Sequence, residues 1–257
     1  KKCKKATNKP YGVNIPLFYP QLKEIFSIII EEEVPVVFTS AGNPNLWTST
    51  LKKNNIIVVQ VVSSVKFAMK SLDAGVDAIV AEGFEAGGHN GIEETTTFTL
   101  IPMVKAAIKI PLIAAGGIAT GGAMLAAIAL GADGVQVGSR FVASIESSSH
   151  DRFKNEVLKA TEGSTILTLK ELIPVRMLKN NFYKKIIRCY EEGADIEVLK
   201  LALGKGRAKK GMFNGDIEEG ELEIGQIAGM INDILPASKI VENLIKEYNE
   251  AVKKITG

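Results

Sequence analysis

A glycine-rich stretch, residues 81–91, carries the side chains of this sequence that are best suited to chemistry. It contains Glu82, Gly87, Gly88 and His89, and it follows an apolar run at residues 77–80. Glycine occurs where the backbone must take a positive φ or approach another group closely. Histidine is the side chain whose charge changes near neutral pH. The stretch therefore predicts a loop whose backbone touches a ligand beside a titratable ring.

Two further glycine loops predict a phosphate site. Gly116-Gly117 follows the apolar run 111–115, and Gly138-Ser139 follows the run 133–137. Backbone N–H groups at such turns and at helix N-termini bind phosphate groups. Each pair alone could be an ordinary tight turn. Because they follow two successive strands, we favour phosphate binding.

Other polar residues near these loops have simpler interpretations. Glu82 and Glu85 could form an acid–base pair, but charged loop residues usually face solvent. Arg140 is expected to brace its loop or to contact a phosphate from outside. His150, after a run of serines, is interpreted as a surface residue or a helix cap.

The composition excludes several classes of protein. The 257 residues are 46% hydrophobic, enough for a large core, and the formal net charge is only +2. Such a charge predicts no general attraction to nucleic acid or to an anionic membrane. No apolar run reaches the roughly 18 residues of a membrane span. Cys3 and Cys189 stand far apart, outside any zinc-type cluster, so we expect no metal site and a cytoplasmic location.

The elements that must position these loops alternate along the chain. Continuous apolar runs without polar alternation, each followed by a helical pattern, are typical of parallel strands that are buried on both faces. The expected strands cover residues 11–15, 34–39, 56–62, 77–81, 111–115 and 133–137. All of the loops with unusual chemistry follow these strands.

This arrangement predicts a TIM-type (β/α)₈ barrel. In that fold the active site lies at the carboxyl ends of the strands, and phosphate binds after strands seven and eight. If Gly116-Gly117 and Gly138-Ser139 follow strands seven and eight, the runs found are strands three to eight. The sequence also begins at Lys1, so we expect a barrel lacking its first two βα units. The alternative is an open doubly wound sheet, but no GxGxxG follows the first strand.

The remainder of the chain has a different pattern. Helices are expected near residues 152–161, 180–192 and 196–203 in a charged segment, followed by apolar helix at 222–234 and a final helix at 236–256. We therefore divide the chain into barrel strands three to eight (1–141), a mainly helical insertion or lid (142–220) and C-terminal helices returning to the barrel (221–257).

The sequence resembles the nitronate monooxygenases (2-nitropropane dioxygenases) and the related FMN-dependent enoyl-ACP reductases. The pairing of the AGGH and AAGGI motifs is the most specific part of this resemblance. The motifs that carry the resemblance span nearly the whole chain: Tyr11-Gly12-Val13-Asn14, Ser40-Ala41-Gly42-Asn43-Pro44, Glu85-Ala86-Gly87-Gly88-His89-Asn90-Gly91, Ala114-Ala115-Gly116-Gly117-Ile118, Gly138-Ser139-Arg140-Phe141 and Gly225-Gln226.

The resemblance implies an FMN-binding barrel with a helical second domain. It implies that His89 is the catalytic residue, facing the reactive side of the flavin ring. The residues it assigns to FMN are Gly116, Gly117, Gly138 and Ser139 at the phosphate, Asn14, Glu82, Gly87 and Gly88 along the ribityl chain and ring, and Gln226 near the C-terminus.

The function implied is that of an FMN-dependent oxidoreductase. The leading hypothesis is a nitronate monooxygenase that converts alkyl nitronates or nitroalkanes and O₂ into carbonyl compounds and nitrite. The alternative is an NAD(P)H-dependent enoyl-ACP reductase of fatty acid synthesis, with an acyl carrier protein as partner. A further alternative is a non-catalytic or incomplete flavin-binding fragment. We also expect a small-molecule substrate and a homodimer.

Overall fold

The centre of the computed structural model, which describes residues 1–257, is a six-stranded parallel sheet. Its strands are the six predicted ones, within a few residues at either end. Their order is β1-β2-β3-β4-β6-β7, so neighbours in the sheet follow one another along the chain. The bounds are β1 Gly12–Pro16, β2 Val36–Ser40, β3 Ile57–Val62, β4 Ala78–Glu82, β6 Leu112–Ala115 and β7 Gly134–Gln136.

The sequential strand order decides between the two predicted architectures. A doubly wound sheet reverses its strand order at a switch point, and this sheet has no reversal. The fold is therefore of the α/β TIM-barrel type, seen here as a curved open sheet with β1 and β7 at its edges. The helices that follow the strands are α2 Leu22–Glu31, α3 Thr48–Lys53 with the short turn Pro44–Leu46, α4 Val65–Asp73, α5 Thr97–Ala107 and α6 Gly121–Ala129; a short α1, Lys2–Ala6, precedes β1.

The two faces of the sheet explain why its strands are apolar throughout. Side chains such as Val37, Ile79 and Ala114 join the large core beneath the helices. The alternate side chains, such as Val59 and Val80, form a smaller cluster on the concave face. Because successive side chains of a strand point to opposite faces, both faces need apolar residues.

The strand register places one row of residues on the concave face near the carboxyl ends. Glu82 pairs with Ala115, and Ala115 pairs with Gln136. The row that begins at Asn14 runs through Phe38 and Val59 and reaches β4 at Ala78. Asn14 therefore shares the face of Glu82 but lies in a row nearer the amino ends of the strands.

Residues 142–220, predicted as a mainly helical insertion or lid and called the lid below, contain strands as well as helices. The expected helices are present as α8 Asp151–Leu158, α9 Asn181–Glu191 and α10 Ile196–Leu203, after a short α7, Ser139–Val142. Between them lies an antiparallel hairpin of β8 Thr165–Thr168 and β9 Val175–Leu178. All residues of β9 are buried, so this hairpin forms part of the lid core.

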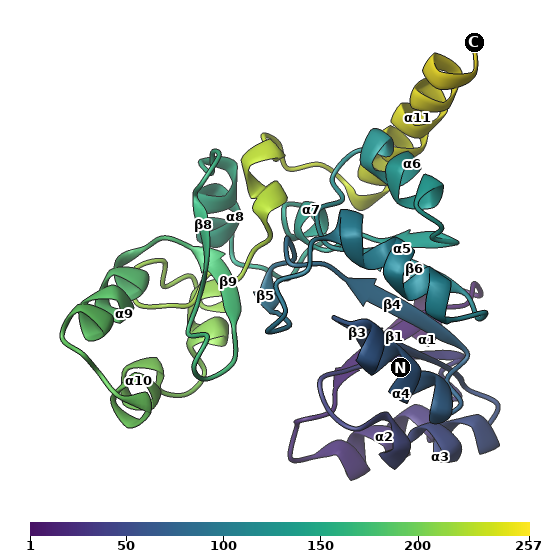
Figure 1. Ribbon diagram of the computed structural model, residues 1–257, viewed down its shortest axis with the longest axis horizontal. Coiled ribbons are helices and arrows are strands. Elements are labelled where there is room, and N and C mark those ends of the chain that lie inside the picture. The colour runs from purple at the N-terminus through teal and green to yellow at the C-terminus, as the bar shows by residue number, and fades with distance from the viewer.

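A third strand joins this hairpin from the glycine-rich loop. β5, Gly88–His89, pairs antiparallel with β9 and forms the edge of a three-stranded sheet. In Figure 1 the lid lies at one side of the molecule and the parallel sheet with its helices at the other, with β5 between them. The predicted loop is thus partly a strand, and it connects the two parts of the molecule.

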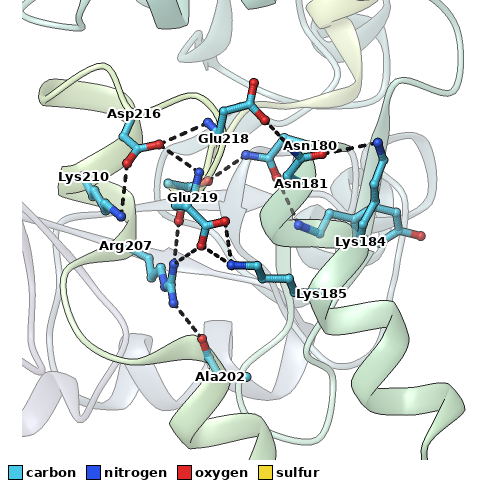
Figure 2. A network of polar contacts seen from close by, with 12 residues as sticks. Asn180, Asn181, Lys184, Lys185, Ala202, Arg207, Lys210, Asp216, Glu218 and Glu219 are labelled. Carbon is cyan, nitrogen blue, oxygen red and sulfur yellow. Dashed lines mark hydrogen bonds and ion pairs between the residues drawn. The ribbon is translucent and has the colours of Figure 1, made fainter.

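A polar network holds the far part of the lid together (Figure 2). Arg207 donates to the carbonyl oxygens of Ala202 and Glu219, at 3.0 and 2.7 Å. Lys185 is paired with Glu219 at 2.6 Å. The Asn180 amide nitrogen donates to the carbonyl of Gly220 at 2.8 Å. These contacts connect α9, the end of α10 and the segment 207–220. The same segment contains the π-helical turn Lys209–Phe213.

Residues 221–257, called the returning chain below, lead back to the parallel sheet. Residues 222–234 are not the expected apolar helix: Glu223 forms a bridge with Met177, and only Gln226–Met230 is helical, as a 3₁₀ turn. The predicted final helix is confirmed as α11, Ala237–Thr256, which packs on α6, where the Gly121 N–H donates to Glu247 at 2.8 Å. None of the helices combines the length and apolar character needed to cross a membrane.

Candidate functional site

One cavity of about 200 Å³ is lined by residues from the carboxyl ends of the parallel strands, from the lid and from the returning chain. No group of three His, Cys, Asp or Glu side chains is placed to bind a metal ion. The cavity draws on five separate parts of the sequence, and its lining is Glu82, Glu85, Ala86, Gly87, Gly88, Ala115, Gly116, Gly117, Ile118, Gln136, Gly138, Ser139, Val142, Met212, Glu223, Ile224 and Ile227.

Most of the residues predicted to bind FMN meet in this cavity, and three predicted site residues do not line it. Asn14 lies in a row of the concave face that is nearer the amino ends of the strands, and it is exposed. Gln226 is exposed on the 3₁₀ turn, where its N–H donates to the carbonyl of Glu85 at 2.9 Å. His89 directly follows the lining residue Gly88. The structure brings together Glu82, Gly87, Gly88, Gly116, Gly117, Gly138 and Ser139.

The glycine turns present free backbone donors to the cavity. Gly116 and Gly117 have φ values of +88° and +71°, which disfavour any other residue. The N–H groups of Gly116, Gly117 and Gly138 donate no hydrogen bond to the protein. Around the position of a Gly138 Cβ there is open space to 4 Å. Unpaired donors beside open space are a suitable arrangement for an oxyanion.

Ser139 connects the free N–H groups of Gly116, Gly117 and Gly138, called the glycine cradle below, to the returning chain. Its hydroxyl oxygen accepts a hydrogen bond from the Gly225 N–H at 2.9 Å. A hydroxyl that accepts one hydrogen bond still has a proton to donate. Ser139 can therefore hold the Gly225 turn and donate to a ligand at the same time.

Two carboxyl groups in the cavity have raised pKa values. Burial raises the pKa of Glu82 from 4.5 to about 7, and burial raises that of Glu223 to about 6. Desolvation disfavours the charged form of a carboxyl group. Near neutral pH a fraction of these groups is therefore protonated, which limits negative charge in the cavity and makes them able to donate.

Glu85 has a structural role that the sequence left open. Its carboxylate accepts hydrogen bonds from the Thr97 N–H at 2.9 Å and from the Thr97 hydroxyl at 3.0 Å. A carboxylate at the N-terminus of α5 satisfies free donors and interacts favourably with the helix dipole. Glu85 thus anchors the glycine-rich loop to α5, and an acid–base pair with Glu82 is not needed to explain it.

His89 lies on β5 beside the loop that follows β1. Its ring centre is 6.1 Å from that of Phe18, in an edge-on arrangement, and Phe18 is itself 5.1 Å from Tyr19. The His89 side chain is solvent-exposed at the surface. The protein packed on its inner side partly desolvates the ring and lowers its pKa from 6.5. The imidazole is therefore mostly neutral at pH 7, the form that can accept a proton.

Arg140 and His150 have local structural roles. Arg140 is paired with Asp233 and donates to the Asp233 carbonyl at 3.2 Å, so it braces its loop against the returning chain. His150 caps α8, with its Nδ1 accepting the Arg152 N–H at 3.1 Å. The expectation that His150 is a helix cap is confirmed.

The sequence analysis missed the lining residues that come from the lid and the returning chain. Glu223, Ile224 and Met212 enter the cavity through contacts made after the long insertion. Their only local signal is their position: Glu223 and Ile224 directly precede the Gly225-Gln226 motif. A short polar and apolar alternation beside a glycine is too common to indicate a site.

Comparison with known proteins identifies related sequences and structures. A family model described as nitronate monooxygenase matches residues 1–247. A probable nitronate monooxygenase of Staphylococcus saprophyticus is 32% identical over 250 residues, which cover 91% of this chain and 68% of the relative. Its counterpart in Staphylococcus aureus is 31% identical over 262 residues, which cover 95% of this chain and 74% of the relative.

Two solved structures extend the comparison over the whole fold. FabK from Thermotoga maritima is 42% identical and superposes with a TM-score of 0.92, over 99% of this chain and 80% of its own. A nitroalkane oxidase from Streptomyces ansochromogenes is 26% identical with a TM-score of 0.80, over 99% of this chain and 85% of its own.

Proposed function

Because the chain belongs to the nitronate monooxygenase family of oxidoreductases, we propose that it uses FMN to oxidise alkyl nitronates or nitroalkanes with O₂ to carbonyl compounds and nitrite. The observation that carries this proposal is the cavity itself. It joins a cradle of free backbone donors at Gly116, Gly117 and Gly138 to the loop that bears His89.

The residues present fit the phosphate end of FMN. The free N–H groups of the glycine turns and the Ser139 hydroxyl are the donors that a phosphate needs. The cavity of about 200 Å³ is below the roughly 300–1,000 Å³ of a whole ligand pocket. We therefore place the phosphate in the cavity and the ring system beyond it, toward the concave face of the sheet and β5.

FMN, when bound, supplies the electron transfer between substrate and O₂. The contribution of this chain is to position the substrate and to move a proton. A neutral His89 imidazole can accept the proton from the α-carbon of a nitroalkane. Toward a nitronate, which has already lost that proton, the same ring can donate a hydrogen bond. The lowered pKa of His89 keeps the proton-accepting form available below neutral pH.

Partial protonation of the Glu82 and Glu223 carboxyl groups reduces the negative charge that an anionic substrate meets in the cavity. Two fully charged carboxylates in the cavity would repel both a phosphate and a nitronate. With pKa values of about 7 and about 6, these groups carry less than full charge at neutral pH. Glu82 in its protonated form can also donate to the cofactor.

A second candidate is an NAD(P)H-dependent reductase that passes hydride from the flavin to an enoyl thioester carried by an acyl carrier protein. The 42% identity to FabK from Thermotoga maritima, an enoyl-ACP reductase, favours this candidate, because the value exceeds the identities to the nitronate and nitroalkane enzymes. The cavity does not distinguish the two, because both reactions use the same FMN.

An anaerobic reduction experiment separates the two candidates. The FMN-loaded protein is mixed with propyl nitronate, or with NADH or NADPH, and the flavin absorbance is followed. Rapid bleaching by propyl nitronate, with nitrite formed after air is admitted, supports the monooxygenase. Rapid bleaching by a nicotinamide alone, followed by oxidation with an enoyl thioester, would transfer the proposal to the reductase.

A further inference from the structure

Arg176 is a charged residue that is buried where the lid meets residues 84–90, the loop that carries His89. It lies on β9 opposite Gly88, and its exposed fraction is 2%. Its Nε and Nη2 atoms donate to the carbonyl oxygen of Phe84, at 3.1 and 3.0 Å. The guanidinium carbon stands 4.5 Å from the centre of the Phe84 ring. One lid side chain thus holds both the backbone and the ring of a single loop residue.

Buried charged groups are usually paired with an opposite charge, but Arg176 forms no salt bridge. Glu85 and Glu94 act on Arg176 through their charges, but desolvation is the larger effect and lowers its pKa. The hydrogen bonds of its guanidinium go to the Phe84 carbonyl and, at 3.4 Å, to the Thr165 hydroxyl. Apolar side chains often replace buried charges without loss of stability. The specific property of arginine here is a rigid fork of donors that fixes one carbonyl in direction as well as distance.

The loop is fixed at its other end by Asn90. The Asn90 side chain donates to the carbonyls of Ala86 and Gly88, at 2.9 and 3.0 Å. Its N–H donates to Pro174 of the lid at 2.8 Å. Residues 84–90 are therefore attached to the lid at both ends, and His89 lies between the attachments.

We propose that Arg176 is a positioning residue that fixes the loop 84–90 against the lid and thereby sets the placement of His89. The inference rests on the proposed function only in that His89 serves the reaction. Arg176 acts through the Phe84 carbonyl and the β5–β9 pairing, without contact to the substrate. Loss of the fork lets the loop move away from the lid, and water then reaches the inner side of the His89 ring.

Arg207 provides a matched control within the same lid. Its guanidinium stands 4.7 Å from the Phe182 ring, and its Nε donates to the Leu203 carbonyl at 2.8 Å. The type of contact is therefore the same, but Arg207 belongs to the lid network of Figure 2, and its partners lie outside the loop 84–90. Comparing the two arginines separates positioning of His89 from general support of the lid.

The test is an NMR titration of the two histidines in the FMN-loaded protein. The chain contains only His89 and His150, so ¹³C-labelled histidine gives two ring signals, which a His150→Ala variant assigns. We expect Arg176→Met to raise the His89 pKa toward its ordinary value, because the ring regains water. We expect Arg207→Met to leave the His89 titration unchanged.

Steady-state kinetics provide the second readout. Arg176→Met should lower kcat by about 10- to 100-fold, the effect of displacing a catalytic group by roughly 1 Å, with a smaller change in KM. Arg176→Lys keeps the charge but offers no fork, so its His89 titration should be intermediate; it also replaces the Met variant if that variant does not fold.

An unchanged His89 titration in a folded Arg176 variant would overturn the proposal. An equal change in Arg207→Met would also overturn it, because the effect would then come from the lid in general. A His89 titration that moves as expected in a protein without nitronate turnover would leave the proposal standing and would refute the proposed function instead.

Discussion

The chemistry of single residues in this protein depends on how far each is removed from water. Burial raises the pKa of Glu82 and Glu223, and partial burial lowers that of His89. Desolvation favours the neutral form in both cases. Near pH 7 the site therefore contains a carboxyl group that is partly protonated, Glu82, and a histidine ring that is mostly neutral, His89, so both a proton donor and a proton acceptor are present.

Replacing His89 with alanine tests the proton-transfer role. We expect turnover to fall by about 10²- to 10⁴-fold, the range for loss of a general base, while the flavin spectrum stays nearly unchanged because the glycine turns assigned to the FMN phosphate remain intact. His150→Ala is the control, since it removes only the cap of α8. Unaltered turnover in His89→Ala would exclude a catalytic role.

The Gly138→Ala variant tests the phosphate cradle. There is open space around the position of the new Cβ, and the backbone φ of −104° suits alanine. We expect no loss of stability but weaker FMN binding, because Gly138 lines the cavity and the methyl group occupies space assigned to the phosphate. Gly122→Ala on the exposed side of α6, outside the cavity, meets only a side-chain atom at 3.8 Å and serves as control. FMN titrations by fluorescence measure both, and equal affinities would contradict the phosphate assignment.

The buried Glu221 predicts a specific pH dependence of stability. Burial, with the nearby Glu223 charge, raises its pKa from 4.5 to about 7. The unfolded chain then releases this proton first, so the contribution of Glu221 is full below pH 4.5 and is lost as pH rises toward 7. The free energy of unfolding should fall there by about 1.4 kcal/mol per pH unit.

Glu221→Gln stays uncharged and should remove that decline. Urea unfolding of both proteins at pH 5 and pH 8 is the measurement. The variant should gain stability relative to the natural chain between the two pH values, whereas the exposed Glu250→Gln should not. Parallel pH profiles for Glu221→Gln and the natural chain would contradict the raised pKa.

At the scale of elements, the six strands of the parallel sheet could be predicted from the sequence, whereas the three strands of the antiparallel sheet could not. The strands of the parallel sheet were predicted because burial on both faces makes each a continuous apolar run. β8 and β9 form a hairpin without a continuous apolar run, and the two-residue β5 forms only because it pairs with the distant β9. Local pattern contains no information about such partners.

The packing of α11 on α6 leaves no space for a side chain at Gly121. A Cβ on Gly121 would stand 2.0 Å from the backbone nitrogen of Tyr248. We expect Gly121→Ala to destabilise the protein by about 1–3 kcal/mol, as overpacking does. Gly122→Ala has only a side-chain atom at 3.8 Å and should be neutral or stabilising. Urea unfolding midpoints compare them, and equal midpoints would contradict the close packing.

At the scale of the whole molecule, the cavity requires the sheet, the lid and the returning chain together. The glycine turns of the sheet were predictable from their residue types and spacing. Met212 and Glu223 were not, because their place in the cavity depends on how the lid folds back. The assignments of His89 and the FMN-contacting residues, and the division at residues 141 and 220, remain predictions.

Ligand-dependent thermal stability tests the assembled cavity. A ligand that binds only the folded chain stabilises it, by about 2.7 kcal/mol at 100 times its Kd. The melting temperature should therefore rise with FMN concentration. Riboflavin, which has no phosphate, should raise it much less at equal concentration. Equal rises with the two flavins would show that the glycine cradle does not bind the phosphate.

The attachment of the loop 84–90 to the lid has a consequence for the order of folding. The Arg176–Phe84 contact joins residues that are 92 positions apart in the chain. Closing such a loop costs about 2 kcal/mol more chain entropy than closing one of ten residues. The strands of the parallel sheet, which pair with sequence neighbours, can form first. His89 therefore reaches its final place among the last events of folding, after the lid hairpin has formed.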